Sequence, residues 1–439
     1  MKRDIPQLLI ADGRGRIFNL PHLEAAGMKG GFFFRPAPED LVKLPAGSEL
    51  FMLLDRLPVG YDCATGRYVS IVTNAFSKKI ERCYAVAAFV AAGFTINHTS
   101  AYIEVGRPRM LPLFAYAACA FYRGGFYASA VRVDRGLRHD SRFIDIGRVK
   151  RNAARMKRHF ARNRLLRHLE KCALTYGCAN AQNFFLNRYE APLPTSPYCN
   201  ARCLGCISYQ ERSRPPATQP RIAFVPSACE ISELALFHIE NANDPIVSFG
   251  QGCEGEPLLR ADVIEKAICL IRSKTARGTL HMNTNASKPA LISKLFDSGL
   301  DSIRVSLNSV REEYYARYYK PKAYTFHDVA ASIKIAKKKG GYVSLNYLTM
   351  PGFTDSRDEC AALRDFIATH RVDMIQWRNL NFDPLRYFRE LKVFVDRSEM
   401  HGVREMIGSL KREFPALTMG YFNPSRLTAA RTRSPLSCS

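Results

Sequence analysis

Three cysteines lie close together near the middle of the chain: Cys199, Cys203 and Cys206, in the spacing C-x3-C-x2-C. Three thiolates on one short loop can hold three irons of a four-iron, four-sulfur cluster. The fourth iron then has no ligand from this loop and stays open to a small molecule. The spacing therefore predicts an iron–sulfur cluster with one accessible iron.

A structural zinc site is the alternative for the same cysteines. Structural zinc usually has four protein ligands, often arranged as two pairs along the sequence. The loop offers no second pair, although His238 or His281 could complete a set. We favour the cluster and keep zinc as the alternative.

A glycine-rich turn follows a strand-like segment further along the chain, and it contains Gly255-Glu256-Pro257. Glycine lets the backbone approach a ligand closely. A carboxylate beside it can hold a cationic amine, and backbone groups add hydrogen bonds. Gly255 and Glu256 are therefore candidate binding residues.

Short amide and hydroxyl side chains stand at the ends of the next two strand-like segments. Side chains of this kind suit the hydroxyls of a sugar. They would act together if the strand ends converged on one pocket. The candidates are Thr284, Ser306 and Asn308.

Together these motifs resemble the radical S-adenosylmethionine (radical SAM) superfamily over about residues 190–390. The resemblance implies a [4Fe-4S] cluster whose open iron is chelated by S-adenosylmethionine. One electron from the reduced cluster would cleave the sulfur–carbon bond of this cofactor, and the 5′-deoxyadenosyl radical would abstract hydrogen from a substrate. An external electron donor, flavodoxin- or ferredoxin-like, is expected as a partner. The sequence does not identify the substrate.

The resemblance also implies roles for the strand ends. The turn at Gly255 and Glu256 matches a Gly-Gly-Glu-Pro-like turn that binds the methionine amine, with Glu254 in place of the first glycine. Contacts to the ribose and carboxylate of the cofactor would come from Thr284, Ser306 and Asn308. The sequence departs from the family pattern at Leu204-Gly205, where an aromatic residue usually precedes the third cysteine.

A regular alternation of strands and helices begins at about Asn183 and predicts parallel βα units. Functional loops are then expected at the carboxyl ends of the strands, as in closed βα barrels. The expected fold class is α/β, a partial (βα)6 barrel of the radical SAM type. The expected strands are Phe184–Leu193, Pro245–Phe249, Thr279–Asn283, Ser302–Leu307, Tyr342–Leu348 and Asp373–Trp377, and the helices lie near Leu258–Arg277, Pro289–Ser298, Phe326–Lys339 and Asp358–His370.

The rest of the chain divides into three further parts. Residues 1–147 mix short apolar runs with Gly and Pro turns, which predicts a smaller α/β or α+β N-terminal domain of unknown role. Residues 148–185 are expected to form an Arg-rich helical linker. Val149, Ala153 and Met156 recur at helical spacing, which predicts one amphipathic helix over Arg148–Lys171. The barrel is expected over residues 186–398, and a C-terminal helix and basic tail over 399–439.

Three more cysteines lie where they could bind a metal or take part in the reaction. Cys172 and Cys178 lie just before the barrel and could help to bind a second cluster or a zinc ion, although buried thiols are the simpler interpretation. Cys253 lies inside the glycine-rich turn. It could face the radical as a hydrogen donor or covalent carrier, although local packing is the simpler interpretation.

The charge of the chain is strongly basic, with a formal net charge of +24. Such a balance is typical of proteins with a polyanionic partner or substrate, so an RNA-modifying enzyme is one hypothesis. A small-molecule or protein-modifying enzyme is another, and a non-catalytic iron–sulfur or zinc protein that binds nucleic acid is a third. Scattered cysteines, the lack of a signal-peptide pattern and the lack of a long apolar run predict a cytoplasmic protein without a membrane span.

Overall fold

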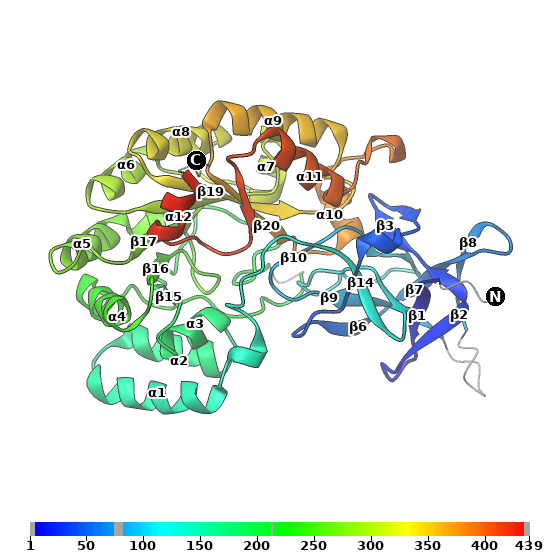
Figure 1. Ribbon diagram of the computed structural model, residues 1–439, viewed down its shortest axis with the longest axis horizontal. Helices are drawn as coiled ribbons and strands as arrows, with labels where there is room; N and C mark the ends of the chain where they lie inside the picture. The colour runs from blue at the N-terminus through cyan, green and yellow to red at the C-terminus, as the bar shows by residue number, and fades with distance from the viewer. Residues whose placement is uncertain (1–4, 74–81, 212–213, 434–439) are drawn as a thin grey trace, which may run out of the picture.

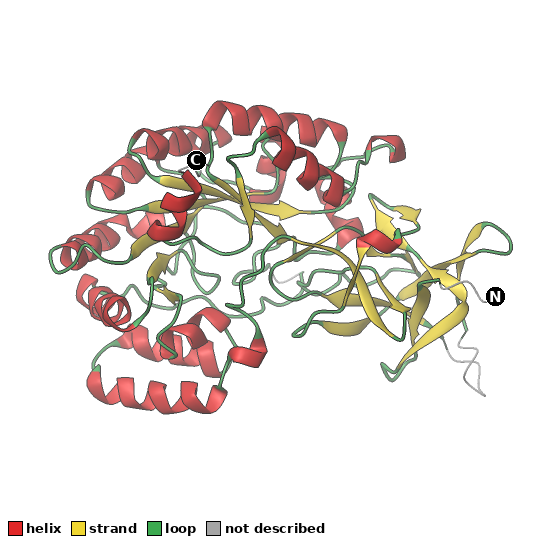
Figure 2. Ribbon diagram, viewed as in Figure 1, coloured by secondary structure: helices red, strands yellow, loops and turns green. Residues whose placement is uncertain are grey.

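A computed structural model describes residues 5–73, 82–211 and 214–433 of the chain. Its strands form an antiparallel assembly at the N-terminal end and a curved parallel sheet in the second half (Figure 1). Helices cover the outer side of the parallel sheet (Figure 2). No helix in the described ranges is long and apolar enough to cross a bilayer.

The parallel sheet has seven strands that follow one another in sequence order. Each neighbouring pair is parallel, as the alternation of strands and helices predicts. The expected mixed α/β class with a partial barrel is therefore confirmed. The strands are β15 (Glu190–Pro192), β16 (Ile246–Phe249), β17 (Thr279–Thr284), β18 (Ser302–Leu307), β19 (Tyr342–Thr349), β20 (Met374–Asn379) and β21 (Thr418–Gly420).

Helices connect successive strands of this sheet and bury their apolar faces against it. Ile264, Ile268 and Ile271 of one such helix, for example, are fully buried at helical spacing. These helices are α4 (Ala228–Asn241), α5 (Ala261–Arg272), α6 (Pro289–Asp297), α7 (Glu312–Tyr319), α8 (Phe326–Lys338), α9 (Arg357–His370), α10 (Pro384–Leu391) and α11 (Val403–Glu413).

The helical linker is a pair of helices rather than the single expected helix. Helix α1 (Ile146–His159) ends before Asn163, whose side chain caps the start of α2 (Arg164–Leu174) by accepting from the Leu166 amide. The expected inner face is present, since Val149 and Met156 are buried. The two amphipathic helices thus pack as a unit with α3 (Ala179–Phe185) beside the barrel (Figure 1).

The first strand of the barrel is shorter than predicted. The apolar run that begins at Phe184 starts as the end of α3, and only Glu190–Pro192 is extended. Apolar runs of this length do not distinguish a buried helix end from a buried strand, which explains the difference.

The N-terminal part is built from antiparallel strands, and its described residues before Ile146 contain only two 3-10 turns as helical elements. Its short apolar runs all became strands, so the α component expected there is absent from those residues. The strands are β1 (Gln7–Ala11), β2 (Ile17–Ala25), β3 (Gly27–Lys29), β4 (Phe32–Phe34), β5 (Leu41–Lys43), β6 (Glu49–Leu53), β7 (Arg56–Asp62), β8 (Arg67–Ser70), β9 (Tyr84–Phe89), β10 (Phe94–Ile96), β11 (Thr99–Ser100), β12 (Tyr102–Glu104), β13 (Cys119–Tyr122) and β14 (Gly125–Arg132).

The two halves of the molecule are joined by specific polar contacts. Strand β10 lies against the end of β20: the Ile96 amide donates to Asn379 Oδ1 at 2.9 Å, and Asn379 Nδ2 donates to the Phe94 carbonyl at 3.0 Å. Arg56 on β7 reaches Asp383, which caps α10, at 3.1 Å. The side chains of this ion pair are only 1% and 2% exposed, so it is shielded from water.

The C-terminal segment contributes a seventh strand that the sequence did not predict. Strand β21 pairs with β20 and is followed by α12 (Arg426–Arg433). Between them, Asn423 donates to Glu190 Oε1 on the opposite edge strand at 2.9 Å and accepts from Gln376 at 2.9 Å. This segment therefore spans the gap between the first and the last strands of the sheet. The end of the expected basic tail, residues 434–439, lies outside the described residues.

We expect Arg56→Met to lower the free energy of unfolding by about 3–5 kcal/mol, because it leaves the buried Asp383 carboxylate without its cation. Urea unfolding followed by the fluorescence of Trp377, the single tryptophan, measures the change. The matched control is Arg389→Met, which breaks an exposed pair with Glu104 and should cost at most about 1 kcal/mol. Equal effects of the two variants would contradict the interpretation.

Candidate functional site

The cysteine loop follows β15 and contributes to the wall of one cavity. Cys199, Cys203 and Cys206 are all partly buried and line this cavity. Burial raises the pKa of the Cys203 thiol, and the neighbouring Cys206 and Cys199 raise it further. A cationic metal centre bound by the three sulfurs would favour their thiolate forms. The three candidate ligands thus lie at the same cavity.

Helix α7 fixes the backbone of this loop. The amides of Arg202 and Leu204 donate to the carbonyls of Tyr319 and Tyr318 at 2.9 and 3.0 Å. The loop is therefore held at both sides of Cys203 before any metal binds, which reduces the entropy lost when ligands are ordered around a cluster.

The glycine-rich turn after β16 lies directly against the cysteine loop. The Gly255 amide donates to the Ser196 carbonyl at 2.6 Å, and the Glu256 amide donates to the Tyr198 carbonyl at 2.7 Å. A Cβ atom added at Gly255 would lie 1.9 Å from the Tyr198 oxygen, so only glycine fits there. The two motifs found in the sequence therefore form one continuous wall of the cavity.

Glu256 is buried, and its carboxylate accepts hydrogen bonds from three groups of the chain. The Asn285 and Leu258 amides donate at 2.8 and 3.1 Å, and the Thr284 hydroxyl also donates. Burial nevertheless raises the pKa of Glu256 to about 7. A carboxyl group in this state ionises readily when a cationic amine lies beside it, as the expected ligand would require.

Glu254 is a residue whose role the sequence analysis missed. It replaces the first glycine of the expected turn, and its buried carboxylate accepts from the Thr195, Ser196 and Gln251 amides at 2.7, 2.9 and 2.7 Å. It thereby ties the turn to the segment that leads into the cysteine loop. Its position between two glycines was the available signal.

The candidate residues at the other strand ends lie in different surroundings. Thr284 and Ser306 line the cavity, with Thr284 oriented by its bond to Glu256. Asn308 is fully buried, and its amide donates to the Tyr387 hydroxyl at 3.1 Å and to the Tyr314 carbonyl at 3.3 Å. The expectation that Asn308 contacts a ligand is therefore not supported: its side chain joins β18 to α7 and α10. Polar residue type alone could not separate these two positions.

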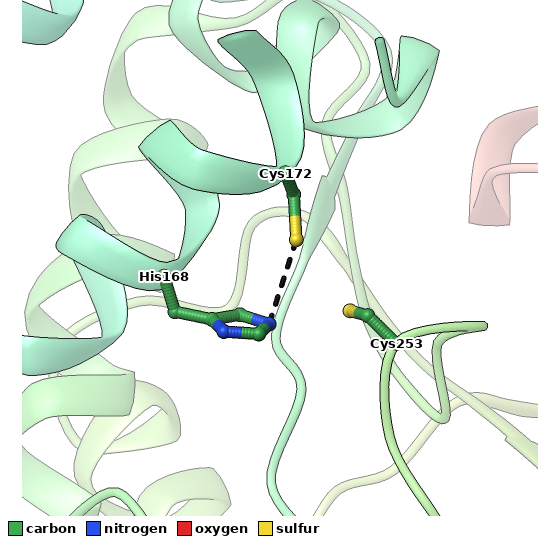
Figure 3. Close-up of side chains that lie close together, drawn as sticks. All are labelled: His168, Cys172 and Cys253. Atoms are coloured by element: carbon green, nitrogen blue, oxygen red, sulfur yellow. Dashed lines mark hydrogen bonds between the residues drawn. The ribbon is translucent and has the colours of Figure 1, made fainter. Parts of the chain in front are cut away.

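Cys253 lies in the turn but faces away from the cavity. It is not among the described residues that line the cavity, and its thiol lies instead beside His168 and Cys172 of α2 (Figure 3). The hypothesis that it faces the reacting centre is corrected by this geometry. A hydrogen bond with Cys253 lowers the pKa of Cys172 to about 5, burial acts against this shift, and His168 adds to it.

The opposite wall of the cavity carries two arginines, Arg304 and Arg378. Arg304 on β18 donates to Gln376 at 2.8 Å, and the guanidinium of Arg378 on β20 lies 3.8 Å from the centre of the Tyr421 ring. Burial lowers the pKa of Arg304 to about 9, and the nearby Arg378 charge lowers it further. The Nε atoms of both arginines are buried and have no hydrogen-bond partner among the described residues.

The N-terminal domain closes part of the cavity. Phe89, Val90 and Ala115 are lining residues, and the enclosed volume is about 460 Å³. Ligand pockets commonly measure 300–1,000 Å³. A second aromatic wall comes from Tyr318 and Tyr319 of α7. The N-terminal domain, whose role could not be predicted from the sequence, therefore helps to form the cavity.

Gly205 explains how the cavity accommodates the missing aromatic residue of the cysteine loop. A Cβ atom added at Gly205 would lie 2.9 Å from the Tyr318 hydroxyl and 3.0 Å from the Asn381 carbonyl. A large side chain at this position would collide with α7, whose own tyrosine takes up the space. The aromatic surface is thus supplied from a different element.

Comparison with protein families identifies the central part of the chain. Residues 193–363 match the model of the radical SAM superfamily. An uncharacterized protein of Methanocaldococcus jannaschii, MJ0804, is 29% identical over 157 residues, which cover 33% of this chain and 54% of that protein. The chain thus matches about half the length of this curated relative.

Solved structures with a similar course of the chain include radical SAM proteins. Methylornithine synthase PylB is 16% identical with a TM-score of 0.36, over 55% of this chain and 67% of its own. SuiB of Streptococcus suis, bound to the precursor peptide SuiA, is 15% identical with a TM-score of 0.38, over 60% and 58%. A radical SAM methyltransferase from Sphaerobacter thermophilus is 12% identical with a TM-score of 0.35, over 46% and 63%. Similarity at this level does not extend to reaction or substrate.

The raised pKa of Glu256 predicts a pH dependence of stability. The folded protein holds the proton more tightly than the unfolded chain, so this contribution is present at pH 5 and is lost as the pH rises through about 7. A shift from 4.5 to about 7 corresponds to about 3 kcal/mol. Glu256→Gln should reduce, by about 3 kcal/mol, the change in the free energy of unfolding between pH 5 and 8, measured by urea denaturation without added ligand. The remaining slope comes from Glu254 and Glu359, since burial raises the pKa of each to about 7 as well. Glu312→Gln, an exposed control on α7, should keep the wild-type slope, and a wild-type slope in Glu256→Gln would refute the assignment.

Proposed function

Because the chain belongs to the radical SAM superfamily through its domain over residues 193–363, we propose that this enzyme binds a [4Fe-4S] cluster and cleaves S-adenosylmethionine to start hydrogen abstraction from a substrate. The single observation that carries the proposal is the shared wall of the cavity, in which the cysteine triplet and the Gly255–Glu256 turn are joined by backbone hydrogen bonds. A metal-binding loop and an amine-binding turn at one cavity are what this chemistry needs.

The residues at the cavity fit the expected groups. Cys199, Cys203 and Cys206 supply three thiolates on one loop, which leaves one iron of a four-iron cluster open. When bound, the cluster and S-adenosylmethionine together supply a one-electron cleavage that yields the 5′-deoxyadenosyl radical. Its electron comes from an external donor, which we propose is flavodoxin- or ferredoxin-like.

The chain's own residues would bind and orient the cofactor. Glu256 would hold its amine, with the carboxylate kept in place by the Asn285 and Leu258 amides. Thr284 and Ser306 offer hydroxyls at the ends of neighbouring strands, where they suit the ribose. Tyr318, seated against Gly205, offers an aromatic surface near the cysteine loop.

The substrate would occupy the side of the cavity near β20, and we propose that it carries an anionic group such as a carboxylate or phosphate. Arg304 and Arg378 present two positive charges to the cavity, and their buried Nε atoms have no partner among the described residues. A buried donor without a partner is costly, and an anion would satisfy it. This feature agrees with the excess of basic over acidic residues in the chain.

The N-terminal domain would shield the reaction from water. Phe89, Val90 and Ala115 place apolar surface at the cavity, and β10 is bonded to the end of β20 beside them. A radical abstracts hydrogen from the bound substrate only if competing groups are kept out, so a closed, apolar wall serves the chemistry. The described cysteines are all free thiols, which fits a reducing cytoplasm as the site of action.

An RNA substrate is the alternative, and the outer face of α1 is the feature that favours it. Arg148, Lys150, Arg151 and Arg155 are exposed on one helix. Exposed charge of this kind also occurs on helices that only face solvent. The anionic-substrate proposal rests instead on charges that line the cavity, and an RNA whose phosphate enters the cavity would still use Arg304 or Arg378.

Cys203→Ala should abolish both the visible absorbance of the cluster and the formation of 5′-deoxyadenosine with a chemical reductant, because it removes one of three thiolate ligands. Anaerobic reconstitution with iron and sulfide counts, followed by chromatography of the products, measures both. Cys269→Ala, which removes an exposed cysteine of α5, should retain both properties. A Cys203→Ala protein with a full cluster and normal cleavage would rule out the proposed chemistry.

Arg378→Met should weaken the binding of inorganic phosphate to the protein loaded with S-adenosylmethionine by about tenfold or more, since a charge-assisted hydrogen bond is lost. Calorimetric titration gives the dissociation constant, and the affinity for S-adenosylmethionine should stay within about threefold of the wild type. The exposed Arg412→Met variant on α11 is the control. If the wild type binds no phosphate, or if both variants bind it equally, the arginines do not form an anion site.

A further inference from the structure

A second group of metal-binding side chains lies outside the cavity, between α2 and the turn that follows β16. It consists of His168, Cys172 and Cys253, whose donor atoms all lie within 4.8 Å of one another. His168 and Cys172 are four residues apart on α2 and so project from the same face of the helix. Figure 3 shows Cys253 facing them from the turn.

One distance within this group matches tetrahedral coordination of a zinc ion. Zinc bonds to sulfur at about 2.3 Å and to nitrogen at about 2.0–2.1 Å, so a tetrahedral site separates a sulfur and a nitrogen ligand by about 3.6 Å. Cys172 Sγ and His168 Nε2 are 3.5 Å apart. This pair therefore has the separation that a shared ion would require, and Cys253 lies within 4.8 Å of both.

The surroundings of the group fit a structural ion. Cys172 and Cys253 are 2% and 5% exposed, and His168 is partly buried. Both cysteines are free thiols rather than a disulfide. Thiolate and imidazole ligands together favour zinc over magnesium or calcium, which prefer oxygen.

A fourth ligand is available in Cys178, at the start of α3. Its amide donates to the Cys172 carbonyl at 2.9 Å, which brings the two residues to the same turn of the chain. Closed zinc sites with three cysteines and one histidine are a common type.

We propose that His168, Cys172 and Cys253 bind one zinc ion, with Cys178 as the fourth ligand. The ion clamps the helical linker to the turn that carries Gly255 and Glu256. Binding releases the protons of the thiols, and no electron is transferred. The site is separate from the cysteine loop, and zinc bound there does not depend on the cluster.

The first test measures metal content in the full-length protein purified and reconstituted without oxygen. We expect about one zinc per chain by mass spectrometry in the wild type. Cys172→Ala and His168→Ala should each lower zinc at least fivefold while the iron content stays at the wild-type level. The exposed Cys269→Ala is the matched control and should keep its zinc.

The second test removes the cluster ligands instead. The triple variant Cys199→Ala, Cys203→Ala, Cys206→Ala should lose iron and keep one zinc. When the same variant is produced in zinc-poor medium with added cobalt, it should show the visible bands of tetrahedral Co²⁺ and a sulfur-to-metal charge-transfer band. This readout does not require cofactor cleavage, so it is independent of the proposed function.

Several results would overturn the zinc site. One is a loss of bound zinc from the variant that lacks the three loop cysteines. Another is an unchanged zinc content in both Cys172→Ala and His168→Ala. A third is a wild-type protein that contains no zinc. A Cys172–Cys253 disulfide found by mass spectrometry of oxygen-free protein would also exclude it. Because His168 is only partly buried, His168→Ala should fold even if Cys172→Ala does not.

Discussion

The close approach of two backbone segments, at Gly255 and Tyr198, is the constraint on which the candidate site depends. Amides of the turn donate to carbonyls of the segment that leads into the cysteine loop, and the lack of a side chain at Gly255 permits this contact. Glu254 and Glu256 add bonds on either side of it. The cysteine loop and the Gly255–Glu256 turn can act on one ligand only if their spacing is fixed, and here main-chain atoms fix it.

The cavity combines parts of the chain that differ in origin and chemistry. Its cysteine wall is polar and pre-ordered by α7, its far wall carries Arg304 and Arg378, and its cover comes from apolar residues of the antiparallel domain. The buried Arg56–Asp383 pair and the bonds between β10 and β20 hold that cover in place. A ligand enclosed in this way meets charge at one end and little water at the other, which strengthens electrostatic contacts.

Much of the parallel sheet could be predicted from the sequence, because strands buried on both faces appear as short apolar runs between helical patterns. The three-residue strand β21 carries too little pattern to be recognised, and the N-terminal runs did not reveal that they pair with one another. The cysteine loop and the Gly255–Glu256 turn were found because their spacing is itself the chemical requirement. The direction in which the side chains of Asn308 and Cys253 point could not be predicted, because residue type does not reveal it. Arg304 was not singled out, because arginines in a strongly basic chain do not stand out.

The bridge made by Asn423 has a consequence for how the molecule is assembled during synthesis. Glu190 and Asn423 are 233 positions apart, yet their side chains meet at 2.9 Å and connect the two edges of the curved sheet. Tyr421 and Phe422 beside Asn423 also line the cavity. On the ribosome, the antiparallel domain and the cysteine loop emerge long before this segment does. The chamber therefore stays open on one side until the segment around Asn423 has left the ribosome and docked between the two edge strands.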